Sequence, residues 1–396
     1  MKKRAEVVII GGGVIGCSIA YNLAKDGVNA VVLERNHLAH GASGRCGGII
    51  WAQWYPEGTN ELMSRVSNMT LNRFANLEDE LDTDIEYTRE NIILCLEAGA
   101  ENRCDSYIQE LEKYYNTKLE YLKPEEIQKM APYIGADNYE AGGYLHSGEI
   151  SYASANPFLT VHALANAAKR LGATFYTGTE VTGIVVENEK VKGVQTNQGD
   201  IKTGIVVDAA GAWSADVAMM AGLKVPTRPH GEDAVVTEPV MPLPYFPSIP
   251  GTYGRQTKSG QILLGDEIFP EQVPGYSIET SLDFLQRISE YLTKMFPSFA
   301  NINIQRQWAG TEDITPDYLP ILGKADEVAG LILACGFSCG FCLSQAVGEL
   351  VADIILEKDK NQDIAEALNL NRFEKKYREY PGRWYFTGVH GIVDPH

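Results

Sequence analysis

The chain lacks a long uncharged apolar run, and it has few basic residues for its acidic content. A membrane-spanning helix needs about 20 consecutive apolar residues, and Glu6 interrupts the apolar stretch that follows Lys2-Lys3-Arg4. The 34 basic residues stand against 52 acidic ones, which gives a net charge of −18. Such a charge repels phosphate backbones and anionic lipid surfaces. We therefore expect no nucleic-acid partner and no integral membrane segment.

A disulfide framework and a histidine metal site are also missing. The cysteines, at positions 17, 46, 95, 104, 335, 339 and 342, are odd in number and irregularly spaced. This pattern favours reduced thiols and a cytoplasmic location. The histidines show neither HxxxH nor HxxE spacing, so we expect no zinc or non-haem iron. With 396 residues, of which 44% are hydrophobic, the chain is long enough for two lobes.

The N-terminal region has the order strand, glycine turn, helix, strand and acid. Residues 6–10 form a β-branched run typical of a strand buried on both faces. A glycine turn at 11–16 leads into helical apolar spacing over 17–26, and the apolar run 30–33 ends at Glu34. In a dinucleotide-binding unit, Gly11 would permit the tight turn, Gly13 would admit a pyrophosphate and Gly16 would let helix and strand pack closely. Glu34 would accept hydrogen bonds from ribose hydroxyls.

A second glycine-rich loop, residues 41–50, follows this unit almost directly. Its small residues would let backbone amides approach a ligand that extends past the pyrophosphate. FAD is such a ligand. An NAD-linked Rossmann enzyme remains an alternative, because the first motif alone does not distinguish the two cofactors.

The chain resembles the FAD-dependent D-amino-acid oxidase superfamily, which includes glycine oxidase, sarcosine oxidases and the catalytic subunits of proline and sarcosine dehydrogenases. The similar blocks occur in family order from residue 7 to about 356. They are Glu34-Arg35 with Ala42-Ser43-Gly44-Arg45 and Gly47-Gly48, then residues 206–214, the hairpin 253–265, Trp308-Ala309-Gly310, Thr315-Pro316-Asp317, the segment 319–323, and Gly336-Phe337-Ser338 with Gly340-Phe341.

This resemblance implies an α/β fold in which a Rossmann-like FAD-binding domain is interleaved with an α+β substrate domain built on a mostly antiparallel sheet. We expect the FAD-binding domain at 1–85, 146–222 and 320–370, the substrate domain at 86–145 and 223–319, and a C-terminal tail at 371–396. FAD would be bound non-covalently, because the position of a flavin-linking cysteine aligns near Gly310. The expected cofactor contacts are Gly11, Gly13, Ile15, Gly16, Glu34, Arg35, Ala42, Ser43, Arg45, Gly47, Gly48, Val181, Ala210, Gly211, Trp213, Gly336, Gly340 and Phe341.

The implied activity is oxidation of the C–N bond of a small amino acid or N-substituted amino acid. Hydride would pass to flavin N5 and leave an imine. A helix that starts near Gly340 would direct its positive end at the flavin. The alternative from another class is a non-catalytic or electron-relay flavoprotein subunit of a heteromeric dehydrogenase complex. Either function allows an electron-accepting partner subunit.

The sequence departs from the family at the substrate. Glycine-oxidase-like members carry an arginine after Trp-Ala-Gly to clamp the substrate carboxylate, whereas Thr311-Glu312-Asp313 stands here. Arg255, beside Tyr253, is the remaining candidate for a carboxylate partner, and a structural role is equally open to it. The substrate-pocket candidates are Trp51, His230, Tyr253, Arg255, Glu312 and Cys339.

Cys335, Cys339 and Cys342 have the spacing of an iron–sulfur motif. The context favours another interpretation, because Cys335 ends an apolar strand-like run and Cys342 falls in the first turn of a predicted helix. We expect no metal and assign these residues to packing and flavin contact. Elsewhere we predict one long helix over 60–81, a helix start at Pro124 and a proline-rich β region over 223–310.

Overall fold

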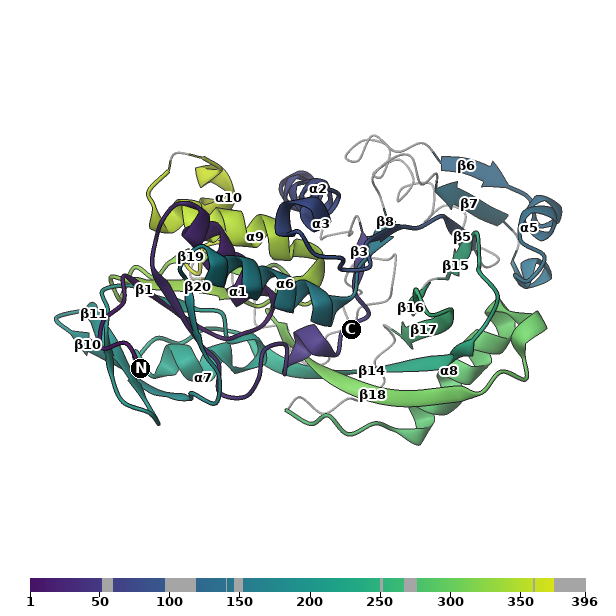
Figure 1. Cartoon of the computed structure of the whole chain (residues 1–396). Coiled ribbons are helices and arrows are strands. Elements are labelled where there is room, and N and C mark those ends of the chain that lie inside the picture. The colour runs from purple at the N-terminus through teal and green to yellow at the C-terminus, as the bar shows by residue number, and fades with distance from the viewer. Residues whose placement is uncertain are drawn as a thin grey trace.

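The computed structural model describes residues 1–51, 60–96, 119–139, 141–145, 152–249, 252–266, 276–358 and 360–373. Its central element is a six-stranded sheet with the order β19-β20-β13-β1-β2-β9, parallel except for β19 (Figure 1). The strands are β1 (Val7–Ile10), β2 (Ala30–Leu33), β9 (Thr174–Tyr176), β13 (Val206–Asp208), β19 (Ile321–Lys324) and β20 (Leu331–Cys335).

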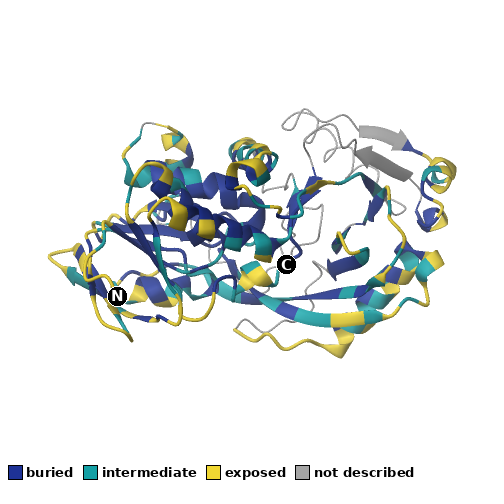
Figure 2. Cartoon of the chain, in the orientation of Figure 1, coloured by how far each residue is buried: buried dark blue, intermediate teal, exposed yellow. Residues whose placement is uncertain are grey.

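Both faces of this sheet are covered, which explains its continuous apolar runs. Because side chains alternate along a strand, Val7 and Ile9 pack against a helical layer, and Val8 and Ile10 pack against a small antiparallel sheet and α7. The sheet interior is buried, as Figure 2 shows. The helical layer contains α1 (Val14–Lys25), α2 (Asn60–Phe74), α3 (Leu77–Leu81), α6 (Pro157–Arg170), α9 (Gly340–Ile355) and α10 (Gln362–Ala367); the opposite layer contains β10 (Val181–Glu187), β11 (Lys190–Thr196), β12 (Ile201–Lys202) and α7 (Ser214–Met219).

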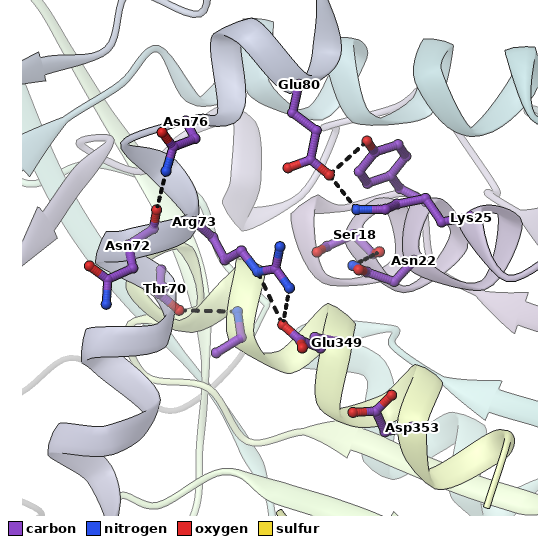
Figure 3. A network of polar contacts seen from close by, with 12 residues as sticks. Ser18, Asn22, Lys25, Thr70, Asn72, Arg73, Asn76, Glu80, Glu349 and Asp353 are labelled. Carbon is purple, nitrogen blue, oxygen red and sulfur yellow. Dashed lines mark hydrogen bonds and ion pairs between the residues drawn. The ribbon is translucent and has the colours of Figure 1, made fainter. Parts of the chain in front are cut away.

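Polar contacts fix the register of the helical layer (Figure 3). Arg73 of α2 pairs with Glu349 of α9 at 2.6 Å. Glu80 of α3 pairs with Lys25 of α1 and accepts a hydrogen bond of 3.0 Å from the Tyr21 hydroxyl. These pairs are partly exposed, so each contributes at most about 1 kcal/mol. They therefore orient helices whose stability comes from apolar burial.

The prediction of a single helix over 60–81 was wrong, because one helix ends at Phe74 and a second begins at Leu77. At the break, the Asn76 side chain donates a hydrogen bond of 3.2 Å to the carbonyl of Asn72. Asparagine side chains compete with the backbone in this way and disfavour helix interiors. The predicted helix start at Pro124 is confirmed: Pro124 opens α5 (Pro124–Met130), and Glu126 accepts a hydrogen bond of 2.7 Å from the backbone N–H of Lys123.

A second hydrophobic core lies between two further sheets and the helices α5 and α8. One sheet is antiparallel, in the order β16-β17-β14-β18, and the other has the order β15-β5-β7-β6. A small sheet, β3-β8-β4, lies beside them. The elements are β3 (Ile49–Trp51), β4 (Thr88–Arg89), β5 (Ile92–Leu96), β6 (Leu119–Leu122), α5 (Pro124–Met130), β7 (Ala141–Leu145), β8 (Tyr152–Ser154), β14 (Arg228–Pro239), β15 (Phe246–Ser248), β16 (Thr252–Gln256), β17 (Gln261–Asp266), α8 (Leu282–Met295) and β18 (Ile304–Ile314).

The fold therefore combines a parallel Rossmann-like sheet with antiparallel sheets, and the predicted fold class is confirmed. The long strands β14 and β18 run along the lower side of the molecule in Figure 1 and connect its two halves. β18 also contacts the short 3-10 turns at Ala42–Gly44 and Gly211–Trp213. The antiparallel sheet thus extends to the carboxyl ends of the parallel strands. Among the described helices, none combines the length and the apolar character needed to span a membrane.

Gly348 of α9 provides a test of the helical layer. An added Cβ would lie 2.0 Å from Ser18 Oγ of α1. We expect Gly348→Ala to lower the free energy of unfolding by about 1–3 kcal/mol through overpacking, measured by thermal or urea denaturation. Gly204→Ala is the control, because nothing lies within 4 Å of its added Cβ. Equal stability of the two variants would contradict the close helix contact.

Candidate functional site

A cavity of about 470 Å³ lies at the carboxyl ends of β1, β2, β13 and β20. This is the edge at which open α/β sheets bind ligands. The two glycine-rich loops, the turn after β13 and the start of α9 line the cavity on one side, and residues of β14, β16 and β18 line it on the other. One continuous cavity thus joins the nucleotide-type motif to the antiparallel sheet.

The first glycine turn is built for close backbone approach. Gly11 has φ +116°, and an added Cβ would lie 2.2 Å from the carbonyl oxygen of Ala209. Gly16 does not line the cavity; its added Cβ would lie 2.1 Å from the Gly11 carbonyl oxygen, in agreement with the packing role proposed for it. Gly13 caps α1 without a side-chain hydrogen bond. Since the first turn of a helix has amides without helical acceptors, this end of α1 is suited to an anion.

Glu34 and Ser43 hold the turn in place. Glu34 Oε2 accepts a hydrogen bond of 2.8 Å from the Gly12 amide, and its Oε1 accepts one of 2.8 Å from Asn36. Ser43 Oγ accepts a hydrogen bond of 2.9 Å from the Val14 amide. The second glycine loop is therefore attached to the N-terminus of α1.

Aromatic stacking shapes one end of the cavity. The guanidinium carbon of Arg35 lies 4.1 Å from the ring centroid of Trp213. Tyr276 also stacks on Trp213, with ring centroids 5.3 Å apart and an interplanar angle of 6°. Arg35, Trp213, Val181, Ala210 and Gly211 all line this end, as does Glu34.

Strands β16 and β18 hold the second glycine loop. Trp308 Nε1 donates a hydrogen bond of 2.7 Å to the carbonyl of Arg45, and Arg45 Nη1 donates one of 3.3 Å to the carbonyl of Ala309. From β16, Arg255 Nε donates a hydrogen bond of 2.6 Å to the carbonyl of Gly47. An added Cβ at Gly310 would lie 3.2 Å from Arg45 Cβ. The Trp-Ala-Gly segment is thus a docking surface for this loop.

The other end of the cavity is aromatic and acidic. It contains Trp51, Tyr152 and Tyr253 together with Glu232 and Glu312. Burial raises the pKa of Tyr253 well above its ordinary value, and the nearby carboxylates of Glu232 and Glu312 raise it further. The Tyr253 hydroxyl therefore stays protonated and can donate a hydrogen bond.

Thiols also line the cavity without forming a metal site. Burial raises the pKa of Cys46 to about 11 and that of Cys342 to about 12. Both thiols are therefore protonated near neutral pH, which makes them poor nucleophiles. Cys335 is fully buried at the end of β20, whereas Cys339 lines the cavity. Within the described ranges, no three His, Cys, Asp or Glu side chains are grouped to hold a metal ion.

Two buried carboxyl groups lie beside the turn after β13. Burial raises the pKa of Asp208 to about 8 and that of Asp313 to about 7. Asp208 Oδ1 accepts a hydrogen bond of 3.2 Å from the Ala210 amide, and Asp313 Oδ2 accepts one of 2.6 Å from the Gly336 amide. The Ser214 hydroxyl beside Asp208 and the Thr227 hydroxyl beside Asp313 partly offset the effect of burial on these two pKa values. Asp313 thereby joins β18 to the loop that follows β20.

The structure brings most of the predicted site residues to the cavity wall and leaves some behind it. Arg255 does not line the cavity, because it is used to hold Gly47. His230 lies away from the wall, and burial together with the nearby Arg228 lowers its pKa to about 4. Gly336, with φ +74°, also lies behind the wall. The predicted residues on the wall are Gly11, Gly13, Ile15, Glu34, Arg35, Ala42, Ser43, Arg45, Gly47, Gly48, Trp51, Val181, Ala210, Gly211, Trp213, Tyr253, Glu312, Cys339, Gly340 and Phe341.

Several wall residues escaped the sequence-based prediction. Glu232 lies two residues after His230, so strand alternation places both side chains on the same face of β14. This alternation of side chains was the sequence signal that could have placed Glu232 near the site. Asp208 does not line the cavity, but its place at the end of an apolar strand was the sequence signal for a buried acid. Tyr152 and His40 carried no local signal for the cavity.

Comparisons with known proteins agree with this architecture. A family model described as FAD dependent oxidoreductase, DAO, matches residues 6–354. Mitochondrial sarcosine dehydrogenase of Homo sapiens is 30% identical over 425 residues; the match covers 100% of this chain but 45% of the relative, so the chain spans about half of its length. Sarcosine oxidase subunit beta of Arthrobacter sp. is 29% identical and is covered to 92%, with 94% of this chain matched. The crystal structure of L-proline dehydrogenase from P. horikoshii superimposes with a TM-score of 0.84 at 32% identity, covering 95% of this chain and 99% of that chain.

The buried carboxyls make the stability of the protein depend on pH. Their folded pKa values of about 8 and about 7 exceed the ordinary value of 3.8, so the folded state retains protons that the unfolded state loses. Stability should therefore fall as the pH rises from about 4 through these values, by roughly 1.4 kcal/mol for each unit of pKa difference. We expect Asp208→Asn to remove part of this loss.

The measurement compares melting temperatures at pH 5 and pH 8.5. Between pH 5 and pH 8.5, the melting temperature of Asp208→Asn should fall by several degrees less than that of the wild type. Asp200→Asn, on an exposed turn, should follow the wild type at both. Parallel profiles of the wild type and the Asp208 variant would contradict a protonated Asp208.

Arg255 is expected to act on the loop and not on a substrate carboxylate. Arg255→Lys keeps the charge but loses the planar Nε donor, so the Gly47 loop should loosen. We expect lower thermal stability and faster release of FAD, followed by flavin fluorescence, with substrate KM changed less than threefold. Arg306→Lys, on an exposed part of β18, is the control. A large rise in KM with unchanged FAD retention would restore the clamp hypothesis.

Proposed function

Because the chain belongs to the FAD-dependent oxidoreductase family DAO, we propose that its cavity holds FAD and that it oxidises a C–N bond of a small amine or amino acid. The observation that carries this proposal is the continuity of the cavity. It extends from the glycine turn at the N-terminus of α1 to the aromatic and acidic end beside β14, β16 and β18. A dinucleotide and a small substrate would therefore share one continuous space.

The residues present suit FAD. An added Cβ at Gly11 would collide with the Ala209 carbonyl, so only glycine lets this cavity-lining turn pack against the end of β13. The first turn of α1 would bind the pyrophosphate, Glu34 would accept from ribose hydroxyls, and Arg35 with Trp213 would border the adenine. We propose non-covalent attachment, since Gly310 has no side chain that could link to a flavin.

When bound, FAD supplies the acceptor for the hydride that leaves the carbon bearing nitrogen. The chain contributes position and electrostatics. Trp51, Tyr152 and Tyr253 exclude water and confine the substrate, which holds the reacting carbon in place. Helix α9 begins at Gly340 on the cavity wall, so its positive end faces the cavity and stabilises negative charge there. No side-chain base is required if the amine enters unprotonated.

Further aspects of the proposal concern organisation and partners. We propose the division into FAD-binding and substrate domains at the boundaries expected from the sequence, since the separate hydrophobic cores support it. The similarity to a subunit named sarcosine oxidase subunit beta supports an electron-accepting partner subunit. The cysteines that the structure describes are all free thiols, which supports a reducing, cytoplasmic location.

An anaerobic titration tests the activity. The purified protein should be yellow, and at least one member of a panel of D- and L-amino acids, sarcosine, proline analogues and simple amines should bleach the flavin absorbance. Dithionite provides the fully reduced reference. A flavin that dithionite bleaches but no amine does would favour the electron-relay alternative. A colourless protein that does not take up FAD would favour the NAD-linked alternative.

A matched pair of variants controls for the FAD site. Gly11→Ala and Gly199→Ala both place a side chain at positive φ, at +116° and +113°. Only the first collides with backbone, because nothing lies within 4 Å of an added Cβ at Gly199. We expect Gly11→Ala to lose FAD and Gly199→Ala to retain it, with both folded by circular dichroism.

A further inference from the structure

Tyr276 contacts the cavity from outside its wall, at the end where Arg35 and Trp213 would border the adenine. Its ring stacks on Trp213, with centroids 5.3 Å apart and an interplanar angle of 6°. Its hydroxyl donates a hydrogen bond of 2.5 Å to Oδ2 of Asp216. Trp213 and Asp216 both line the cavity, whereas Tyr276 does not. One side chain thus holds two neighbouring residues of the wall.

The two contacts restrict the wall in different ways. The stack favours one plane for the Trp213 indole, since aromatic pairs prefer a defined geometry. The hydrogen bond joins a phenol to a carboxylate, so it is stronger than a bond between neutral groups. Burial and the bond to Asp216 raise the pKa of Tyr276 to about 12, and the phenol therefore remains a donor near neutral pH. Both wall residues are held by a group that does not itself occupy the cavity.

Other contacts of Trp213 lead into the proposed nucleotide site. The guanidinium carbon of Arg35 lies 4.1 Å from the centroid of the same indole. An added Cβ at Gly41 would lie 3.6 Å from the Trp213 ring, so the indole lies next to the second glycine loop. A change in the orientation of the indole would therefore disturb both Arg35 and the surface at Gly41. Both residues line the cavity.

Tyr276 belongs to a segment that is anchored in the second hydrophobic core. Ser281 caps helix α8, where its Oγ accepts a hydrogen bond of 3.0 Å from the Phe284 amide. Phe284 is buried in that core. The carbonyl of Ser281 also accepts a hydrogen bond of 2.9 Å from Nε2 of Gln307 on β18. The segment 276–281 therefore connects the second core to the wall residues at and before α7, beside the parallel sheet.

We propose that Tyr276 is a positioning residue for the adenine end of FAD: it holds Trp213 and Asp216 in place, slows release of the cofactor and links cofactor retention to the second core. This inference rests on the proposed function, because it requires FAD in the cavity. A wall that is already ordered costs less to bind against, and it must be disturbed before the ligand leaves. Tyr276 thus acts on the residence time of FAD and not on the chemistry at the other end of the cavity.

The rate of cofactor release tests the proposal. The FAD-loaded protein is diluted, and the FAD that leaves it is followed by flavin fluorescence. We expect Tyr276→Ala to raise the release rate about tenfold, because the stack and the hydrogen bond are both lost. Tyr276→Phe keeps the stack and should raise it about threefold. Stopped-flow bleaching of the flavin that remains bound, by a reactive amine or by dithionite, should change less than about twofold, since the aromatic end is untouched.

A double-mutant cycle assigns the hydrogen bond. Asp216→Ala removes the acceptor, so Tyr276→Phe should have no further effect on FAD release in that background. Phe158→Ala is the matched control for the loss of an exposed ring. Phe158 is 47% exposed and Tyr276 43%, and the Phe158 ring contacts that of His162 on α6 with centroids 4.4 Å apart. Neither Phe158 nor His162 lines the cavity, so release should keep the wild-type rate.

The outcomes separate this inference from the function on which it rests. A yellow protein whose Tyr276→Ala variant releases FAD at the wild-type rate overturns the positioning role and leaves the proposed function standing. Faster release accompanied by much slower bleaching indicates a general loss of structure and also overturns a role confined to the adenine end. An equal effect of Tyr276→Phe in both backgrounds overturns the part assigned to Asp216. A colourless protein that takes up no FAD overturns the inference and the proposed function together.

Discussion

The attachment of the second glycine loop to the antiparallel sheet is the contact on which the cavity depends. Trp308 and Arg255 each donate a hydrogen bond to a carbonyl of this loop, and Ser43 of the same loop accepts one from the N-terminus of α1. The loop therefore connects the nucleotide-type turn to β16 and β18. Without this connection, the glycine turn and the acidic wall would belong to separate units and could not face one ligand.

The same connection explains why Arg255 is unsuited to bind substrate. Its burial lowers the pKa of the guanidinium, so it needs acceptors where it lies. The Gly47 carbonyl provides one at 2.6 Å, and the carboxylates of Glu90 and Glu86 favour the charge from further away. Removing a buried cation from such partners to meet a carboxylate in the cavity would leave its acceptors unsatisfied. Arg255 therefore holds the second glycine loop in its conformation.

Sequence patterns located the parts of the site that depend on local backbone chemistry. Gly11, Gly13 and Glu34 belong to one strand–turn–helix–strand unit, where spacing alone fixes their relative positions. The position of Arg255 could not be found in this way, because it depends on how β16 faces a loop 208 residues earlier in the chain. The break at Asn76 was missed for another reason: the apolar pattern continues past it, whereas the Asn76 side chain bonds to the carbonyl of Asn72, a local contact that the pattern does not report.

Alternation along β18 divides the acidic residues into two environments. Glu312 shares its face with Gly310 and projects toward the aromatic rings, whereas Asp313 lies on the opposite face and accepts from the Gly336 amide. Asp313 and Asp208 are so deeply buried that their pKa values rise to about 7 and about 8, and near neutrality they hold protons that exposed carboxyls lose. Near neutrality these acids therefore carry less negative charge than exposed carboxyls would, which reduces their repulsion of the phosphates of the proposed cofactor. Negative charge from this strand is thereby concentrated at Glu312, at the aromatic end of the cavity.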